Sequence, residues 1–257
     1  MLVTTSYDPS EEQLAQAKRL AAELRARLVS RRHASVRKLV KLHHDAELLI
    51  VTDEGVKYVR GEEAPFFYHP SMAMVRIKRL AAGSIDPLVE LAQLRPGDRI
   101  IDCTAGLGSD ALVFSYAGGT ECEVTALETE PILYTLVREG LASYVTELDS
   151  LNEAMRRIRL LQEHHLAYLR RQPDRSADIV YFDPMFRRPV HTSSSIEPLR
   201  HLANPAALDP EAVREACRVA RRTVLLKEHR DSAEFERLGF PEVYRKANNI
   251  AYGVIHL

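Results

Sequence analysis

The chain has 257 residues, enough for one large domain or for one domain with a small extension. Hydrophobic residues make up 46% and charged residues 28% of the sequence, which excludes a disordered chain. The formal net charge is −1, so nucleic-acid binding would have to come from local basic patches and not from the molecule's overall charge.

Cysteine usage and hydropathy indicate the compartment. Cys103, Cys122 and Cys217 are far apart and form no Cys-x-x-Cys pair, so neither a disulfide framework nor a zinc ribbon is indicated. Cys103 and Cys122 sit in apolar runs, where buried free thiols are expected. The first residues do not resemble a signal peptide, and no apolar stretch approaches membrane-spanning length. We therefore expect a protein of the reducing cytoplasm, with no metal site and no membrane partner.

The first eighty residues predict a small α/β appendage. Residues 2–7 have the pattern of a short strand. Ser10 and Gln13 match a capping box ahead of apolar residues at helical spacing. Residues 47–60 predict a β-hairpin around an Asp-Glu-Gly turn.

A basic segment follows the first predicted helix, and Ser35 is placed to cap a second helix within it. The segment has two interpretations of equal weight, a solvated helix face or a surface that contacts phosphate groups. Its basic residues are Arg31, Arg32, His33, Arg37, Lys38, Lys41, His43 and His44.

From Asp98 onward strand and helix patterns alternate, which predicts a parallel sheet built from βαβ units and closed by an antiparallel hairpin. We place the appendage at residues 1–80 and the main domain at residues 81–257. The expected strands are 99–103, 122–128, 158–162, 178–182, 223–228, 242–246 and 250–256. The expected helices lie near 85–93, 109–117, 130–144, 149–157, 209–221 and 231–238.

The strand 99–103 leads into a glycine-bearing turn and then into a helix. Gly106 and Gly108 would let the backbone approach a ligand, and the start of the helix offers free N–H groups. Gly106-x-Gly108-x-x-Ala111 also matches the dinucleotide-binding fingerprint, so this turn alone does not choose between cofactors.

Two acids near this turn narrow the choice of cofactor. Glu128 ends the next strand, where a carboxylate can accept hydrogen bonds from both hydroxyls of a ribose, as in enzymes that use NAD or S-adenosylmethionine. Asp102 lies four residues before Gly106, where an acid would repel a pyrophosphate but favour a sulfonium and an ammonium. The pair favours S-adenosylmethionine, with an NAD-linked oxidoreductase as the alternative.

The corner Asp183-Pro184-Met185-Phe186 ends the strand 178–182. Proline has no N–H and stops the strand ladder, and the turn can direct a carboxylate, a carbonyl and an aromatic ring into one space. That trio suits a planar group with an amino substituent, although an isolated Asp-Pro turn is common. Ligands of open α/β sheets bind outside the carboxyl ends of the strands. The residues expected to line one crevice there are Asp102, Gly106, Glu128 and Asp183.

Residues from about 95 to 257 resemble a class I S-adenosylmethionine-dependent methyltransferase. Asp102-x-x-x-Gly106-x-Gly108 is similar to that family's cofactor loop, and Glu128 to its ribose-binding acid. Asp183-Pro184-Met185-Phe186 is similar to a variant of its Asp/Asn-Pro-Pro-aromatic motif for amino-group methylation. The resemblance implies an α/β fold with a Rossmann-like sheet of parallel strands, a C-terminal antiparallel hairpin and the small N-terminal α/β appendage.

More narrowly, residues 102–111 and 181–186 are similar to the bacterial family that methylates a guanine exocyclic amino group in small-subunit ribosomal RNA. This chain departs from that family at three places. Ser109-Asp110 replaces an Arg-Asp pair, His164-His165 replaces a Ser-Ser pair, and only Lys227 remains of a Lys-Arg-Pro after the fifth strand.

The resemblance implies a role for each matching residue. Asp183 and the Pro184 carbonyl would orient the target amino group, and Phe186 would stack on the base. For His164 and His165, a helix-cap or core role is favoured over contact with adenine. The residues implied to bind the cofactor are Asp102, Gly106, Gly108, Ser109, Asp110, Glu128, Thr129, His164 and His165.

We expect the long connection 187–209 to cover the target base, with Arg187 and Arg188 on substrate phosphate. Lys227 could contact phosphate as well, and a salt bridge is an equal alternative. The predicted function is methyl transfer to an exocyclic amino group, with guanine of 16S ribosomal RNA as the favoured acceptor. The predicted partner is ribosomal RNA or the small ribosomal subunit. A module that binds the cofactor and RNA without transferring methyl is a further alternative.

Overall fold

The computed structural model describes residues 1–61, 63–184, 206–245 and 249–257. The chain forms two compact units. The first comprises Met1–His69 with Thr135–Val145, and the second Pro70–Tyr134 with Thr146–Leu257. Helix α6 (Pro131–Ser143) contributes residues to both.

Among its described residues, the first unit contains a five-stranded sheet in the order β2-β1-β3-β4-β5. The predicted hairpin is present as an antiparallel β3–β4 pair, and β1 runs parallel to β2 and β3. The capping box at the start of α1 is confirmed, because Ser10 and Gln13 exchange two hydrogen bonds of 3.0 and 3.2 Å. The elements are β1 (Leu2–Thr5), α1 (Glu11–Glu23), β2 (Arg27–Leu28), α2 (Val36–His43), β3 (Glu47–Thr52), β4 (Gly55–Arg60) and β5 (Phe66–Phe67).

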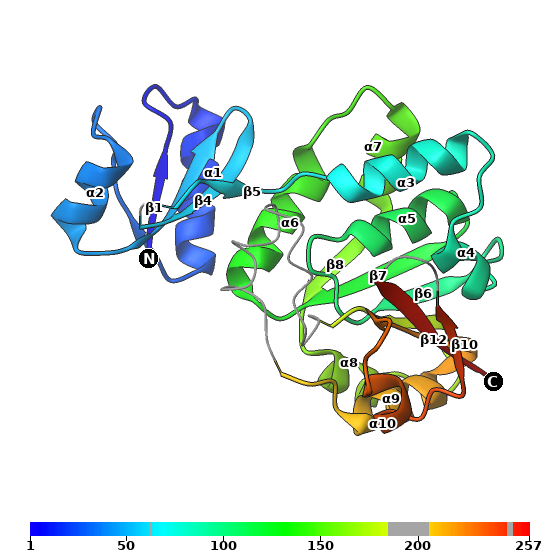
Figure 1. Cartoon of the computed structure of the whole chain (residues 1–257). Helices are drawn as coiled ribbons and strands as arrows, with labels where there is room; N and C mark the ends of the chain where they lie inside the picture. The colour runs from blue at the N-terminus through cyan, green and yellow to red at the C-terminus, as the bar shows by residue number, and fades with distance from the viewer. Residues whose placement is uncertain (62, 185–205, 246–248) are drawn as a thin grey trace. The chain divides into compact units, whose positions relative to one another are not determined.

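The second unit contains, within the described ranges, a seven-stranded sheet in the order β11-β12-β10-β9-β6-β7-β8 (Figure 1). The strands β10, β9, β6, β7 and β8 are parallel, and β12 is antiparallel to both β10 and β11, as expected from the sequence. The strands are β6 (Arg99–Asp102), β7 (Glu123–Glu128), β8 (Arg159–Gln162), β9 (Ala177–Phe182), β10 (Ala220–His229), β11 (Glu242–Arg245) and β12 (Ile250–His256).

Helices cover both faces of this sheet, with α3, α5 and α7 on one face and α8, α9 and α10 on the other (Figure 1). The second face packs on a core that includes Val180, Phe182 and Val213. Proline at the first position of α9 and Asp209 at its N-cap explain where that helix begins. The helices are α3 (Ser71–Ala81), α4 (Pro87–Leu91), α5 (Ser109–Gly118), α7 (Asp149–Arg157), α8 (His165–Arg171), α9 (Pro210–Val219) and α10 (Glu234–Arg237).

The strand order places a switch point at the centre of the sheet. From β6 the chain winds outward through β7 and β8, and it then returns to β9 on the other side of β6. Where the connections from two neighbouring strands run in opposite directions, a crevice forms outside the carboxyl ends of those strands. Asp102 ends β6 and Asp183 follows β9, so the fold places both acids at this crevice.

Two further features concern helix hydropathy and the cysteines. None of the helices in the described ranges is both long enough and apolar enough to cross a membrane. Cys103 and Cys122 are buried free thiols, as predicted.

Candidate active site

The glycine turn after β6 forms as the sequence predicts. Gly106 and Gly108 have φ angles of +52° and +72°, a left-handed backbone that glycine adopts without a steric penalty. The Ala105 N–H donates to the Leu127 carbonyl at 2.9 Å and ties the turn to β7. Among the described residues, a methyl group on Gly106 would meet only the Thr104 carbonyl, at 4.0 Å, which leaves room for a ligand beside this glycine.

Asp102 lies beneath the turn with a side chain that is only 1% exposed. Its Oδ1 accepts a hydrogen bond from the Thr104 N–H at 3.1 Å. Burial raises the pKa of Asp102 to about 8, and the nearby carboxyls of Asp110 and Asp183 act in the same direction. Asp102 is therefore an acid that a neighbouring cation would readily ionise.

Glu128 ends β7 at the same edge of the sheet. Its two carboxylate oxygens accept hydrogen bonds from the Gly106 N–H at 3.0 Å and the Glu130 N–H at 2.9 Å. Burial raises the pKa of Glu128 above its usual value, while these backbone donors favour the ionised form. The side chain is thus fixed in orientation beside the glycine turn, in the position expected of a ribose acceptor.

Asp110 lies in the first turn of α5 and is enclosed by three donors from other elements. Lys227 of β10 donates to its Oδ2 at 2.8 Å, and the Tyr181 hydroxyl of β9 donates to the same oxygen at 2.7 Å. Arg76 of α3 donates to Oδ1. Burial works to raise the pKa of Asp110, but the charges of Lys227 and Arg76 hold it well below its usual range.

Asp183 is joined to this cluster through Lys227, whose ammonium is 2.6 Å from Asp183 Oδ2. The Asp183 N–H donates to the Thr104 hydroxyl at 2.5 Å, so Thr104 contacts both predicted acids of the crevice. Partial burial raises the pKa of Asp183 to about 7, with Lys227 opposing the shift and Asp110 adding to it. The side chain is 25% exposed, so Asp183 remains accessible to a substrate.

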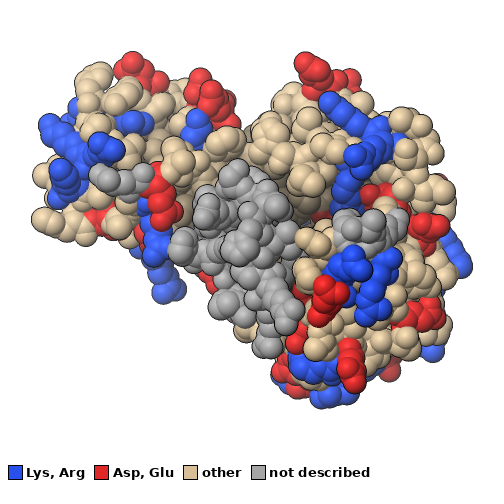
Figure 2. All heavy atoms as spheres, viewed as in Figure 1, with Lys and Arg blue, Asp and Glu red and all other residues tan. Residues whose placement is uncertain are grey.

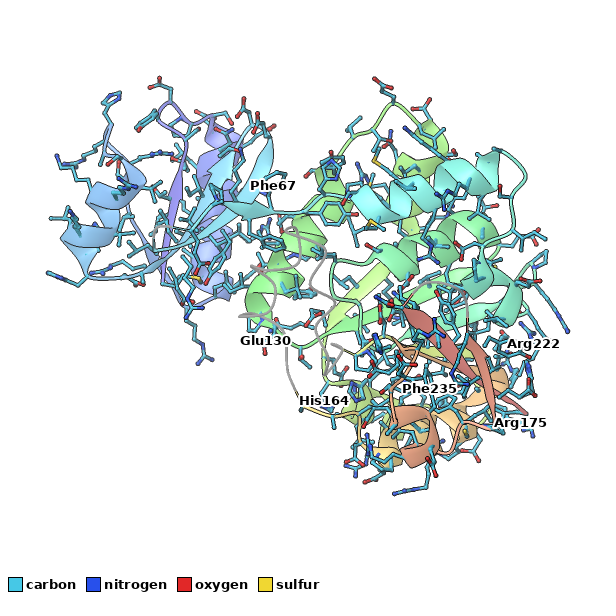
Figure 3. All side chains as sticks on the ribbon, in the orientation of Figure 1. Phe67, Glu130, His164, Arg175, Arg222 and Phe235 are labelled. Atoms are coloured by element: carbon cyan, nitrogen blue, oxygen red, sulfur yellow. The ribbon has the colours of Figure 1, made fainter. Side chains whose placement is uncertain are left out.

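The paired histidines lie where β8 ends, next to the end of β7, since the Glu163 N–H donates to the Glu128 carbonyl at 3.0 Å. His164 caps α8, because its Nδ1 accepts the Leu166 N–H at 3.2 Å. The half-buried His165 ring contacts Phe182 edge-on at 5.8 Å, and burial lowers its pKa to about 4. Figure 3 labels His164 before α8 and Glu130 after β7.

The remaining predicted site residues either adjoin the residues above or lie outside the described part of the chain. Ser109 begins α5 directly after Gly108, and Thr129 follows Glu128 at the end of β7. Phe186, Arg187 and Arg188, predicted to stack on the base and to bind phosphate, lie outside the described residues, as does most of the connection 187–209.

Sequence reasoning missed Arg76, Thr104 and Tyr181. Arg76 also forms two hydrogen bonds of 2.8 Å with Asp86, so it joins the carboxylates that begin α4 and α5. No motif spacing reveals this contact. Tyr181 did carry a usable signal, because a tyrosine in a fully buried strand needs a partner for its hydroxyl.

The site residues fit S-adenosylmethionine better than a pyrophosphate cofactor. Asp102, Glu128 and Asp183 place three acids along the crevice, which favours a cofactor with a sulfonium and an ammonium over one with a pyrophosphate. Of the described residues, the cations close to them are Arg76 and Lys227, and both are already paired with carboxylates. Asp102 would hold the cofactor's cationic end, and Glu128 its ribose. In the described part of the chain, no three side chains of His, Cys, Asp or Glu gather to hold a metal ion.

The sheet order and the acids at its switch point define a class I methyltransferase fold. Residues 69–237 match the family model described as "Putative SAM-dependent methyltransferase". The chain belongs to this family of S-adenosylmethionine-dependent methyltransferases. This membership settles the choice that the glycine turn left open between S-adenosylmethionine and NAD.

Relatives of known sequence and structure agree with this family. YpiP of Bacillus subtilis, itself described as uncharacterized, is 42% identical over 254 residues, covering 99% of this chain and 98% of that protein. Ribosomal RNA small subunit methyltransferase J of Acinetobacter baylyi is 31% identical over 177 residues, which are 67% of this chain and 64% of that enzyme. The enzyme of the same name from Hydrogenovibrio crunogenus is 30% identical over 155 residues, or 58% of this chain and 55% of that protein.

The fold of a crystallised SAM-dependent methyltransferase from Neisseria gonorrhoeae is also similar. It has a TM-score of 0.67 at 17% identity and covers all of this chain and 96% of its own. At this level of identity the likeness concerns the fold.

Proposed function

We propose that this protein transfers a methyl group from S-adenosylmethionine to the exocyclic amino group of a guanine in small-subunit ribosomal RNA. The observation that carries the proposal is the place of Asp183, which follows β9 at the switch point beside Asp102 and is held by Thr104 and Lys227. The relatives named ribosomal RNA small subunit methyltransferase J support the choice of acceptor.

A guanine amino group is a poor nucleophile because its lone pair is delocalised into the ring. S-adenosylmethionine supplies an electrophilic methyl group on a sulfonium. In the proposed mechanism, Asp183 Oδ1 and the Pro184 carbonyl accept the two amino hydrogens, which draws the nitrogen towards tetrahedral geometry and holds its lone pair in line. Asp183 Oδ2 is already engaged by Lys227, which fixes the carboxylate.

Held by Asp102 and Glu128, S-adenosylmethionine would supply the methyl group to this nitrogen and leave as S-adenosylhomocysteine. The nitrogen then carries one proton too many, and Asp183 Oδ1 accepts it. A carboxyl with a pKa of about 7 is suited to this step near neutral pH. Phe186 would stack on the base, and Arg187 and Arg188 would bind phosphate beside it.

Transfer of tritiated methyl groups to unmethylated 16S ribosomal RNA tests the proposal. We expect Asp183→Ala to lower kcat by at least about a hundredfold, because it removes the carboxylate that orients the amino group and takes its proton. Binding of S-adenosylhomocysteine, measured by calorimetry, should stay within about twofold of the original protein. Transfer at the original rate by the variant would overturn the assigned chemistry. A protein that binds cofactor and RNA but transfers nothing would identify a binding module.

A further inference from the structure

The first unit carries a concentrated positive charge although the chain as a whole has a net charge of −1. Residues 24–44 contain seven lysines and arginines, three histidines and no acid, and Glu23 and Asp45 bound the segment. A solvated helix face commonly mixes charges of both signs, so a block of one sign requires a separate explanation.

The fold turns this charge outward. Leu39 is buried and anchors α2, while Ser35 caps it by accepting the Lys38 N–H at 3.2 Å. Figure 2 shows lysine and arginine side chains gathered over α2. We call this the α2 surface, and its exposed basic residues are Arg25, Arg27, Arg32, Arg37, Lys38 and Lys41.

Most of these cations are available to an external anion. Among the described residues, no carboxylate forms an ion pair with Arg25, Arg32, Lys38 or Lys41. By contrast, acids of the same unit do engage Arg19 and Arg138. These four cations thus differ from Arg19 and Arg138 in pairing with no acid of the described part of the chain.

An exposed aromatic ring adjoins the basic segment. Tyr7 follows β1, is 47% exposed, and has the guanidinium of Arg31 at 4.1 Å from its ring centroid. The His33 ring lies parallel to it within 15°, at a centroid distance of 6.1 Å. Arg31 is held in place by hydrogen bonds to the Thr5 and Ala34 carbonyls. Stacked planar groups of this kind can extend their stack with a nucleobase.

We propose that the α2 surface, together with Tyr7, Arg31 and His33, is a docking site for RNA. The cations would contact backbone phosphates, and an unpaired base would stack on Tyr7. Charge alone would also suit an anionic membrane or an acidic protein, but neither needs a stack of tyrosine, guanidinium and imidazole. Helix α2 is moreover only eight residues long, short for a helix that lies in a membrane interface.

The inference rests on the proposed function, because it supplies the substrate-binding surface for an RNA methyltransferase. Docking and transfer residues belong to one chain, so RNA held at the α2 surface has a raised effective concentration at Asp183. Loss of docking should therefore raise KM for RNA and leave kcat unchanged.

A charge-matched pair of variants of the full-length protein tests this. The docking variant combines Arg32→Gln, Lys38→Gln and Lys41→Gln. The control combines Lys18→Gln, Arg95→Gln and Arg159→Gln, which are exposed residues outside the α2 surface. Binding of transcribed, unmethylated 16S ribosomal RNA is measured from 50 to 200 mM KCl, together with thermal unfolding of each variant.

We expect the docking variant to bind about tenfold more weakly at 100 mM KCl. Its salt dependence, log K against log [KCl], should be shallower by about 2, because each single-strand phosphate contact contributes roughly 0.7. Tyr7→Ala should weaken binding about tenfold with an unchanged slope, and Tyr7→Phe should bind normally. The control should stay within about twofold.

Equal RNA binding by the docking and control variants overturns the inference. The inference is also overturned if the docking variant loses binding to phosphatidylglycerol vesicles or polyglutamate but keeps its affinity for RNA. If the original protein docks RNA through this surface yet transfers no methyl group to it, the docking site stands and the proposed acceptor is wrong.

Discussion

At the residue scale, Lys227 has a more defined environment than its sequence position suggested. The ammonium bridges Asp110 and Asp183 at 2.8 and 2.6 Å, so of the two predicted alternatives, phosphate contact or a salt bridge, the salt bridge is present. The contacts motivate a positioning role, in which Arg76 and Tyr181 hold Asp110, Asp110 holds Lys227, and Lys227 holds the Asp183 carboxylate.

Replacing Lys227 with methionine should lower methyl transfer by about a hundredfold and raise the pKa of Asp183, because the neighbouring cation that opposes that rise is removed. The acid limb of the pH profile of kcat/KM should then move to higher pH. Lys227→Arg keeps the charge and should restore most of the profile. An unshifted acid limb in Lys227→Met, measured in a fold shown intact by circular dichroism, would contradict the positioning role.

Asp102 predicts a pH dependence of stability. Its pKa of about 8 in the folded protein lies above the ordinary value of 3.8, so the protonated carboxyl favours folding. This contribution is complete below pH about 4 and is lost as the pH rises through 8. The unfolding free energy should therefore fall between pH about 4 and 8, and fall less in Asp102→Asn. Urea unfolding at several pH values measures this, and parallel curves for both proteins would contradict it.

At the scale of secondary structure, Arg76 joins three helices. It extends from α3 to the Asp86 carboxylate, which caps α4, and to Asp110 in the first turn of α5. Ion pairing keeps both acids ionised against the effect of burial, since Arg76 holds the pKa of Asp86 below its usual range, and Lys227 and Arg76 together do so for Asp110. The arginine thereby fixes the helix that begins at the glycine turn.

Arg76→Met should destabilise the protein by about 3 kcal/mol, because the buried Asp86 carboxylate loses its cationic partner and Asp110 loses one of its two cations. Arg76→Lys, which can satisfy only one of them well, should cost less. Chemical denaturation distinguishes the variants. If Arg76→Met were as stable as the original protein, the contacts of Arg76 with Asp86 and Asp110 would not contribute to stability.

The elements with strong periodicity were the predictable ones. The strands from β6 to β12 follow apolar runs bounded by turn residues, and their order at the switch point brings Asp102, Glu128 and Asp183 to one edge. The helix α3 was missed although it has 11 residues. The short strands β2 and β5 and the helix α8 were also missed, because two to seven residues give no clear period. The ring of donors around Asp110 was also missed, since it is assembled from α3, β9 and β10 by tertiary packing.

At the scale of the whole molecule, the first unit is completed by a distant segment. The sequence presents residues 130–144 as an ordinary crossover helix of the main domain, yet Thr135–Val145 belongs to the first unit. There Glu139 accepts hydrogen bonds from Gln16 at 2.7 Å and Arg19 at 2.8 Å, both on α1. The hydrophobic pattern of a helix indicates that one face is buried, but it does not identify the element that packs against that face. The functional boundary near residue 80 remains a prediction.

A substitution at Gly140 tests whether α6 packs against the rest of the first unit. A methyl group on Gly140 would lie 2.1 to 2.4 Å from carbons of the buried Tyr68 side chain, within the first unit. Such distances require the ring or the helix to move, so Gly140→Ala should destabilise the protein by about 1–3 kcal/mol even though alanine favours helices. In a double-mutant cycle, Gly140→Ala should cost less in the Tyr68→Ala background than in the original protein, because the second change removes the clash.

The same packing predicts the behaviour of fragments. A fragment of residues 1–80 keeps the five strands and α1 but lacks Glu139 and the helix surface that covers Tyr68. We expect it to melt with low cooperativity, and addition of a peptide spanning residues 131–146 to raise its melting temperature. A Gly140→Ala version of that peptide should stabilise it much less. Cooperative unfolding of the fragment alone, unaffected by either peptide, would show that residues 1–80 fold as an independent domain.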